Sequence, residues 1–259
     1  MLILGGTAEA REIAELLASQ PYLRPVYSLA GRTSSPRLPK LPPDQLRRGG
    51  FGGAQALASY LINHRVAAVL DATHPFAAQI SFHAASAAAQ ANIPIARFAR
   101  PAWTPAPGHP WLCVADVDGA IDALCASDAR AARVLLTHGT KQIDGFARCR
   151  GQRLWLRAVD RPVSALPPNM QLILDRGPFD LEAETRLMRD LAIDTLVTKN
   201  SGGDRGATKL RAANALGVQV IMVERPSLPA PSIQIDSVQS ALAWALSLTA
   251  KPTVQPPVA

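Results

Sequence analysis

The sequence has few cysteines, few aromatic residues and no long apolar segment. Its three cysteines, Cys113, Cys125 and Cys149, form no C-x-x-C pair, and no cysteine–histidine spacing typical of a metal site occurs. We therefore expect reduced thiols, a cytoplasmic location and no bound metal. No apolar run approaches the ~18 residues that a membrane-spanning helix needs. The N-terminal residues also lack the basic and apolar regions of a signal peptide.

Charge is scarce but uneven. Charged residues make up 18% of the 259 residues, yet lysine and arginine outnumber the acidic residues and give a formal net charge of +7. Such an excess favours an anionic partner, such as a nucleic acid, a phosphorylated cofactor or a polycarboxylate. An aromatic content of 5% and scattered basic residues disfavour a nucleic-acid binder, because such proteins stack bases on aromatic side chains.

Apolar runs of strand length alternate with helical patterns along the whole chain, which predicts parallel sheets covered by helices on both faces. Expected strands lie within residues 2–6, 25–31, 44–50, 66–75 and 93–99 of the first half, and within 133–141, 153–159, 170–177, 193–203 and 218–226 of the second. Residues 100–111 contain four prolines and are the best linker candidate. We expect two Rossmann-like parallel-sheet α/β domains with a cleft between them, at 1–100 and 112–248, and a flexible tail at 249–259.

The opening stretch "LILGGTAEAR" reads as a strand that stops at a pair of glycines before a helix. Gly5 and Gly6 would let a phosphate approach the backbone, and Thr7 is a good N-cap for the helix that follows. The match to the dinucleotide fingerprint is imperfect, because Ala8 and Arg11 stand where glycines are usual. The alternative is a tight strand-to-helix turn that binds no ligand.

The second expected strand ends in "SLAGRTSS", where an NAD-specific site places an acidic residue. This chain has none there and offers Arg32 and Thr33 instead, a cation and a hydroxyl that suit a 2′-phosphate. The cofactor predicted from these residues is NADPH rather than NADH. A solvated basic loop is the alternative.

Polar residues follow another buried strand in "VLDATHPFA". Asp71, Thr73 and His74 stand at its carboxyl end, where ligands bind in open α/β sheets. His74 could donate a proton or bind a carboxylate. A histidine bonded to the backbone is the alternative for His74, and fixing the turn before Pro75 is the alternative for Asp71.

Two loops in the second half combine glycines with a lysine after a strand. In "TLVTKNSGG" the strand ends at Lys199 and is followed by Asn200, Ser201, Gly202 and Gly203; in "LLTHGTK" it is followed by Thr137, His138, Gly139, Thr140 and Lys141. Successive backbone N–H groups in such loops form anion-binding nests, and the lysines add charge. Either loop alone could be a solvated turn. Together they favour an anionic substrate.

Taken together, the motifs resemble the precorrin-6A reductase family of cobalamin biosynthesis. The resemblance rests on "LILGGTAEAR", "SLAGR", "GGFGG", "DATHPFAAQIS", "RPAW", "RGPFDLE", "VTKNSGGDRGATKL" and "VERP", in this order from residue 2 to about residue 226. It implies NADPH-dependent reduction of one double bond of precorrin-6A to give precorrin-6B, with the active site between two Rossmann-like domains. "LTHGTK" departs from the family's usual Thr-Thr-Gly-Arg and weakens any role for His138.

The resemblance also implies which residues act. Gly5, Gly6, Thr7 and Glu9 match the family's cofactor turn and Arg32 its phosphate-side arginine, while 199–203 match the loop of the second domain. A tetrapyrrole fringed with carboxylates would explain a basic site. The full set of expected site residues is the cofactor group Gly5, Gly6, Thr7, Ala8, Glu9, Arg32, Thr33, Asp71 and Thr73, the substrate group His74, Thr137, Gly139, Lys199, Asn200, Ser201, Gly202 and Gly203, and the catalytic candidates Lys199 and His74.

Three other functions stay open at this point. The substrate could be the cobalt-containing counterpart of the anaerobic route, or the chain could be a dinucleotide-binding redox sensor without catalytic activity. A nucleic-acid binder would show strongly salt-dependent DNA binding. Enzymes of neighbouring steps are candidate protein partners. The proton donor is also open: His74 is one candidate, and water or a later tautomerisation of the macrocycle would serve as well.

Overall fold

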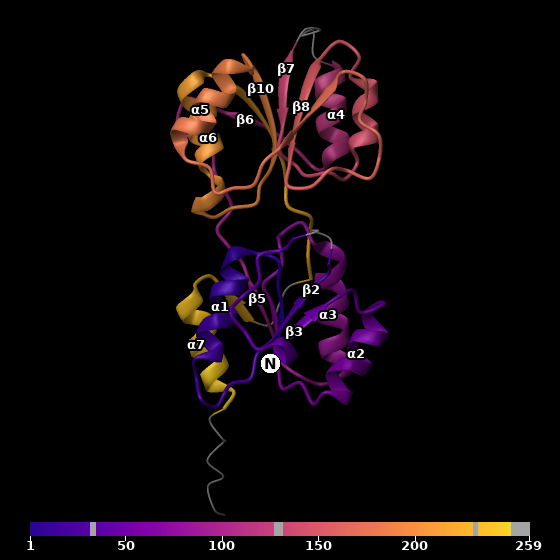
Figure 1. Cartoon of the computed structure of the whole chain (residues 1–259), viewed down its shortest axis with the longest axis vertical. Helices are drawn as coiled ribbons and strands as arrows, with labels where there is room; N and C mark the ends of the chain where they lie inside the picture. The colour runs from indigo at the N-terminus through magenta and orange to yellow at the C-terminus, as the bar shows by residue number, and fades with distance from the viewer. Residues whose placement is uncertain (32–34, 127–131, 230–232, 250–259) are drawn as a thin grey trace, which may run out of the picture. The chain divides into compact units, whose positions relative to one another are not determined.

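The computed structural model describes residues 1–31, 35–126, 132–229 and 233–249, except for the side chain of Arg205. The chain forms two compact units (Figure 1). Unit 1 contains Met1–Arg100 and Ser227–Ala259, and unit 2 contains Pro101–Pro226. The chain therefore passes from one unit to the other twice, after Arg100 and again after Pro226.

Unit 1 is built on a sheet of six parallel strands in the order β12-β5-β4-β1-β2-β3. The strands are β1 (Leu2–Leu4), β2 (Val26–Leu29), β3 (Leu46–Arg48), β4 (Val69–Asp71), β5 (Ile95–Phe98) and β12 (Ile233–Ile235). Read from β3, this is the 3-2-1-4-5-6 order of the Rossmann fold, with β12 as the sixth strand.

Helices cover both faces of this sheet (Figure 1). Helix α1 (Ala8–Ala18) packs against α7 (Val238–Ser247), while α2 (Ala54–Asn63) packs against α3 (Ala78–Gln90). Successive side chains of a strand point to opposite faces. Accordingly Ile3 packs into the core beneath α1 and α7, whereas Leu2 and Leu4 pack into the core beneath α2 and α3. Burial on both faces explains why these strands read as continuous apolar runs. The short 3-10 helix η1 (Pro43–Gln45) precedes β3.

Unit 2 has a second sheet of six parallel strands, in the order β6-β11-β10-β7-β8-β9. Its elements are β6 (Trp111–Val114), α4 (Val117–Ala126), β7 (Arg133–Leu136), η2 (Ile143–Arg148), β8 (Arg153–Ala158), β9 (Met170–Leu174), α5 (Leu181–Asp190), β10 (Thr195–Lys199), η3 (Asp204–Gly206), α6 (Thr208–Leu216) and β11 (Gln219–Val223). The order repeats that of unit 1, with β7 in the place of β1 and β6 in the place of β12. Helices α5 and α6 pack together, and α4 contacts η2.

The structure confirms the expected fold class of two parallel-sheet α/β domains. It corrects the expected boundaries, because β12 and α7 belong to unit 1 rather than to a domain spanning 112–248. The expected linker, 100–111, lies almost entirely within unit 2. Most of the expected tail at 249–259 lies outside the described residues.

Candidate active site

In each sheet the strand order reverses between two neighbouring strands, and we call this place the switch point. Ligands of open parallel sheets bind there, beyond the carboxyl ends of the strands. In unit 1 the reversal lies between β1 and β4, and in unit 2 it lies between β7 and β10. Most of the expected site residues lie at the carboxyl ends of these four strands or in the residues that follow them, at 5–9, 71–75, 137–141 and 199–203. Four separate motifs thus occupy two equivalent places in the fold.

The turn after β1 is shaped by the Tyr27 side chain of β2. Gly5 has no room for a side chain, because a Cβ there would overlap the Tyr27 ring. The Gly6 N–H donates a hydrogen bond of 3.0 Å to the Tyr27 hydroxyl, and burial raises the pKa of that phenol. Gly6 has a φ of +118°, and a Cβ there would meet only Leu29 Cδ2, at 4.0 Å. The open side of Gly6 therefore fits the approach of a diphosphate to the backbone.

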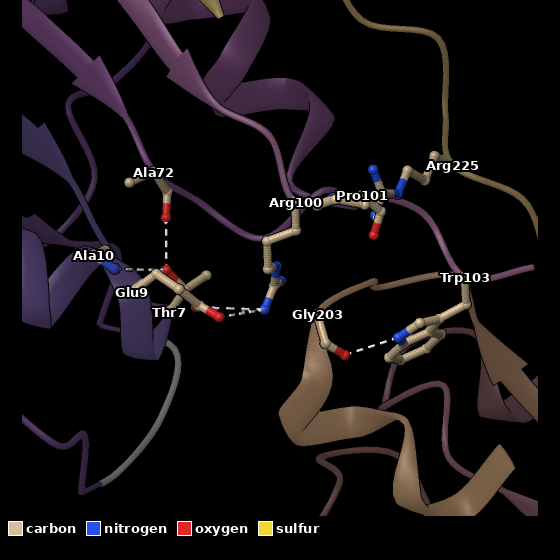
Figure 2. A network of polar contacts seen from close by, with 9 residues as sticks. All are labelled: Thr7, Glu9, Ala10, Ala72, Arg100, Pro101, Trp103, Gly203 and Arg225. Carbon is tan, nitrogen blue, oxygen red and sulfur yellow. Dashed lines mark hydrogen bonds and ion pairs between the residues drawn. The ribbon is translucent and has the colours of Figure 1, made fainter. Parts of the chain in front are cut away.

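Thr7 joins the two loops of the unit 1 switch point. It is the N-cap of α1: its hydroxyl oxygen accepts a hydrogen bond of 3.1 Å from the Ala10 N–H. The same hydroxyl donates to the carbonyl oxygen of Ala72, just after β4, at 2.9 Å (Figure 2). The N-cap prediction for Thr7 is confirmed, and the cap also fixes the β1 turn to the β4 loop.

Glu9 lies in the first turn of α1, directly after Ala8, the first helical residue. Its carboxylate forms an ion pair with Arg100 at 3.3 Å, and both side chains are largely buried (Figure 2). A carboxylate at the N-terminus of a helix occupies the position that favours a phosphate. Arg100 offsets this negative charge, so the helix N-terminus remains compatible with an anionic ligand.

Asp71 ends β4 and is almost completely buried. Its carboxylate accepts hydrogen bonds from the Thr73 hydroxyl at 2.6 Å and from the Thr73 N–H at 3.2 Å, and it pairs with Arg97 Nε of β5 at 3.2 Å. These contacts favour the alternative role that the sequence allowed, in which Asp71 fixes the turn. Thr73 shares in that turn through both of its donors.

His74 is exposed in the same loop. Its Nδ1 accepts a hydrogen bond of 3.2 Å from the Phe76 N–H. In the neutral ring, Nε2 therefore carries the proton. Arg32 and Thr33, expected beside the 2′-phosphate, lie outside the described residues.

In unit 2, Thr137 and Gly139 follow β7. The Thr137 N–H donates to the carbonyl oxygen of Val197 on β10 at 2.9 Å, and its hydroxyl donates to the same oxygen at 3.3 Å. Gly139 has a φ of +94°, and a Cβ there would meet nothing within 4 Å. This loop thus continues the β7–β10 pairing and then opens at Gly139, as a loop that admits a ligand must.

His138, which the sequence analysis set aside, is buried between these two residues, with 4% of its surface exposed. Neither ring nitrogen has a hydrogen-bond partner, and the ring packs on Phe146 of η2 with centroids 5.1 Å apart. Burial and the charge of Lys199 lower the pKa of His138 to about 4, and the nearby Lys141 backbone acts in the opposite direction. The imidazole is therefore neutral at physiological pH.

Lys199 is the last residue of β10 and is partly buried. Burial lowers its pKa, and the positive charge of Lys141 from the β7 loop lowers it further. The two loops therefore bring two cations toward one another. Such a site gains by binding an anion, because a negative charge relieves the repulsion between them.

The residues after Lys199 are held mainly by the protein itself. The Asn200 side chain is buried and exchanges two hydrogen bonds with the Trp103 backbone, at 2.8 and 3.2 Å. The Ser201 N–H donates to the Lys199 carbonyl oxygen at 2.7 Å. Gly202 and Gly203 have φ angles of +69° and +77°. Asn200 was expected to bind the substrate, but its side-chain amide is bonded to the Trp103 backbone instead.

A cluster near this loop escaped the sequence analysis. Arg157 of β8 and Glu184 of α5 form a buried, two-pronged ion pair at 2.9 and 2.8 Å. Lys209, in the first turn of α6, lies over the Trp103 ring at 5.1 Å. Burial and Arg157 lower the pKa of Lys209 to about 8, although Glu184 opposes this. One signal was available in the sequence, because a lysine in the first turn of a helix opposes the helix dipole.

The two switch points differ in charge. In unit 1 the acidic residues Glu9 and Asp71 are each paired with an arginine, whereas in unit 2 the loops contribute Lys141 and Lys199. Within the described residues, no group of three potential metal ligands occurs. No helix in the described part of the chain has both the length and the apolar character needed to cross a membrane. The fold defines a two-unit Rossmann-like α/β protein, and its two switch points are candidate sites for anionic ligands.

Comparison with known proteins identifies the family. Residues 1–246 match the family described as "Precorrin-6x reductase CbiJ/CobK". The chain belongs to this family, as its sequence motifs suggested.

Similar proteins include the precorrin-6A reductases of Rhodococcus erythropolis, at 48% identity over 96% of this chain and 98% of the relative, and of Mycobacterium tuberculosis H37Rv, at 42% identity over 97% and 99%. A solved structure described as "CobK precorrin-6A reductase" superposes with a TM-score of 0.85 at 37% identity, covering 97% of this chain and 98% of that one.

Proposed function

We propose that this chain catalyses the NADPH-dependent reduction of precorrin-6A to precorrin-6B, as an oxidoreductase that acts on a CH–CH group. The observation that carries the proposal is 48% identity over nearly the whole length of a protein named precorrin-6A reductase. The two anion-compatible switch points support it, because both the cofactor and a carboxylate-fringed tetrapyrrole are polyanions.

The metal-free macrocycle is the favoured substrate. Relatives named precorrin-6A reductase reach 41–48% identity, whereas those named cobalt-precorrin-6A reductase reach 26–30%. The assignment rests on this difference in sequence identity. Turnover of the cobalt-containing substrate in preference to the metal-free one would reverse this assignment.

The cofactor diphosphate is assigned to the turn after β1. Gly6 offers an open backbone face, Thr7 fixes the turn, and the N-terminus of α1 supplies N–H groups and a favourable dipole. Bound NADPH supplies the hydride, and the protein supplies binding and orientation. Arg32 and Thr33 are assigned to its 2′-phosphate on the basis of the sequence alone.

The substrate carboxylates are assigned to the loops after β7 and β10. Lys199 provides a partly buried positive charge beside Lys141, and Gly139 provides an open backbone. Lys199 also stabilises negative charge that develops on the macrocycle during reduction. His74 is the candidate proton donor through its Nε2–H, because Nδ1 already accepts a hydrogen bond from Phe76.

The experiment combines purified protein, NADPH and precorrin-6A, and follows the absorbance of the nucleotide and of the macrocycle together. We expect equal amounts of both to be consumed. Binding of NADPH without turnover would indicate that the protein is a redox sensor rather than an enzyme. The location is proposed to be the cytoplasm, which the three free thiols Cys113, Cys125 and Cys149 support.

Two variants test the division of ligands between the units. Gly6→Val places a side chain on the open face of the β1 turn and should raise the KM for NADPH roughly tenfold or more, because one misplaced contact has effects of this size. Lys199→Ala should raise the KM for precorrin-6A by about ten- to a hundredfold, the ratio that a charge-assisted hydrogen bond supplies. If Gly6→Val raised the KM for precorrin-6A and Lys199→Ala raised that for NADPH, the two ligand assignments would have to be exchanged. Unchanged kinetics in both variants would overturn both assignments.

A further inference from the structure

The loop after β10 is hydrogen-bonded to the two segments at which the chain enters and leaves unit 2. The chain enters this unit at Pro101 and leaves it at Pro226. We call residues 101–103 and 224–226 the crossing segments. Both of them bond to residues 200–203 of the loop that the proposed function gives to the substrate.

Trp103 holds the first crossing segment to the loop by three hydrogen bonds. Its N–H donates to Asn200 Oδ1 at 2.8 Å, and its carbonyl oxygen accepts from Asn200 Nδ2 at 3.2 Å. Its indole Nε1–H donates to the carbonyl oxygen of Gly203 at 2.8 Å (Figure 2). The Asn200 amide thus pairs with the backbone of Trp103 as a neighbouring strand would, and both ends of the loop are fixed.

Arg225 holds the second crossing segment to the same loop and to the first segment. Its Nε–H donates to the carbonyl oxygen of Asn200 at 2.8 Å, and its Nη2 donates to the carbonyl oxygen of Pro101 at 3.4 Å. Gly202 makes this close approach possible, because a Cβ there would overlap the Pro101 carbonyl group and the Arg225 guanidinium group. Glycine at 202 is therefore explained by packing against the crossing segments.

The first crossing segment also follows directly on a residue bound to the other ligand loop. Arg100 precedes Pro101 and forms the ion pair with Glu9 in the first turn of α1 (Figure 2). The four residues from Arg100 to Trp103 are thus bonded at one end to the proposed cofactor turn and at the other end to the proposed substrate loop.

We propose that Trp103, Asn200 and Arg225 are positioning residues, which fix the loop that presents Lys199 and link its conformation to both crossing segments. This inference rests on the proposed function for the ligand of the loop. It assigns Asn200 a role different from the substrate contact that its sequence context suggested. The three side chains act through their hydrogen bonds to or within the loop.

Trp103→Phe tests the proposal by deleting one hydrogen bond. The phenyl ring still offers Lys209 an aromatic face, while the bond to Gly203 is lost. Trp155→Phe is the matched control in the same unit, because Trp155 Nε1 donates a single bond of 3.0 Å to Gln171 Oε1 and has Arg133 over its ring at 4.7 Å. Both variants should lower the melting temperature by similar amounts. Only Trp103→Phe should raise the KM for precorrin-6A, by roughly five- to tenfold, the ratio that one hydrogen bond supplies. We call the hydrogen bonds made by Trp103, Asn200 and Arg225 to the loop and the crossing segments the clamp. Equal kinetic effects in the two variants would mean that the clamp contributes no more than ordinary packing.

Arg225→Lys provides a second test, because lysine keeps the charge but cannot reach the Asn200 and Pro101 carbonyl oxygens with one forked group. We expect the same rise in KM with little change in kcat. A variant with wild-type KM and an unchanged melting temperature would overturn the role of Arg225.

Hydrogen exchange separates this inference from the proposed function. Without any ligand, Trp103→Phe should speed amide exchange in peptides covering 199–206 and 101–105, and Trp155→Phe should leave both at the wild-type rate. Addition of precorrin-6A should slow exchange of the loop and of both crossing segments in the wild-type protein. Failure to reduce precorrin-6A would refute the proposed function while the ligand-free comparison still tested the clamp. Independent exchange of the loop and the crossing segments would overturn the clamp itself.

Discussion

Replacing His138 by phenylalanine should make the protein more stable at neutral pH. The imidazole is buried against Phe146, and neither of its nitrogens has a hydrogen-bond partner. A buried polar group left unsatisfied costs about 1–3 kcal/mol, and an apolar group of similar shape avoids that cost. The phenyl ring is slightly larger, which subtracts from the gain because overpacking a core is also unfavourable. We therefore expect the free energy of unfolding to rise by about 1–2 kcal/mol.

The same substitution should remove a dependence of stability on pH. The pKa of His138 falls from 6.5 to about 4 on folding, so between these values the unfolded chain binds a proton that the folded chain does not. Stability must then decrease as the pH falls through this window, by about 3 kcal/mol in all when it reaches pH 4. Lys199 faces this region, and its positive charge adds to burial in lowering the pKa of His138.

Urea unfolding of wild-type and His138→Phe protein at a series of pH values from about 7 to 4.5 measures both effects. The difference between the two proteins isolates this histidine from the other titrating groups. His109→Phe is the matched control, because His109 Nε2 has a partner in the Val218 carbonyl oxygen at 2.9 Å and its loss should destabilise the protein. If His138→Phe proved less stable at neutral pH and kept the wild-type pH dependence, the imidazole would have a partner and the reasoning would fail.

Two further substitutions test the packing around the sites. Gly5→Ala should destabilise unit 1 by about 1–3 kcal/mol in thermal unfolding, because the added methyl group overlaps the buried Tyr27 ring; a second substitution, Tyr27→Leu, should recover part of the loss, and no recovery would point to backbone strain instead. Glu184→Gln should cost about 3–5 kcal/mol by leaving the Arg157 guanidinium group buried without its counter-charge. Replacing Arg157 by Met and Glu184 by Leu together should cost far less, and an equal cost would contradict this account.

The sequence predicted the inner strands of both sheets and missed two edge strands. The inner strands are buried on both faces and contain unbroken apolar runs, such as LIL in β1 and VIMV in β11. The missed strands, β6 and β12, have only four and three residues, and of these only Ile235 is buried. Periodicity therefore gives a weaker signal for short edge strands that are mostly exposed.

The candidate site was predictable in position but not in detail. The apolar runs placed the four loops after β1, β4, β7 and β10, where the structure has them, while their binding of a ligand stays a prediction. The polar side chains in them, however, have partners far along the chain: Glu9 pairs with Arg100, and the Asn200 amide pairs with the backbone of Trp103. A polar residue that binds a ligand and one that holds a loop look alike in a sequence, because the partner that distinguishes them is brought near only by the fold.

The two missed strands also explain why the expected domain boundaries were wrong. Both units share one strand order, and in each the sixth strand is followed by a helix: β12 by α7 in unit 1, and β6 by α4 in unit 2. Along the chain, however, β6 follows the five strands of unit 1 and β12 follows the five strands of unit 2. Each half of the chain thus gives its last strand and helix to the other unit.

This exchange requires the chain to cross twice where a simple tandem arrangement would cross once. Cutting the chain at one crossing would leave the units joined by the other. Without β12 and α7, unit 1 would lack an edge strand and a covering helix, and unit 2 would lack the same without β6 and α4. Pro101 and Arg225, which stand beside the two crossings, are bonded to one another in unit 2 and lie against Gly202. The residues beside the two crossings are therefore the same ones that hold the loop after β10.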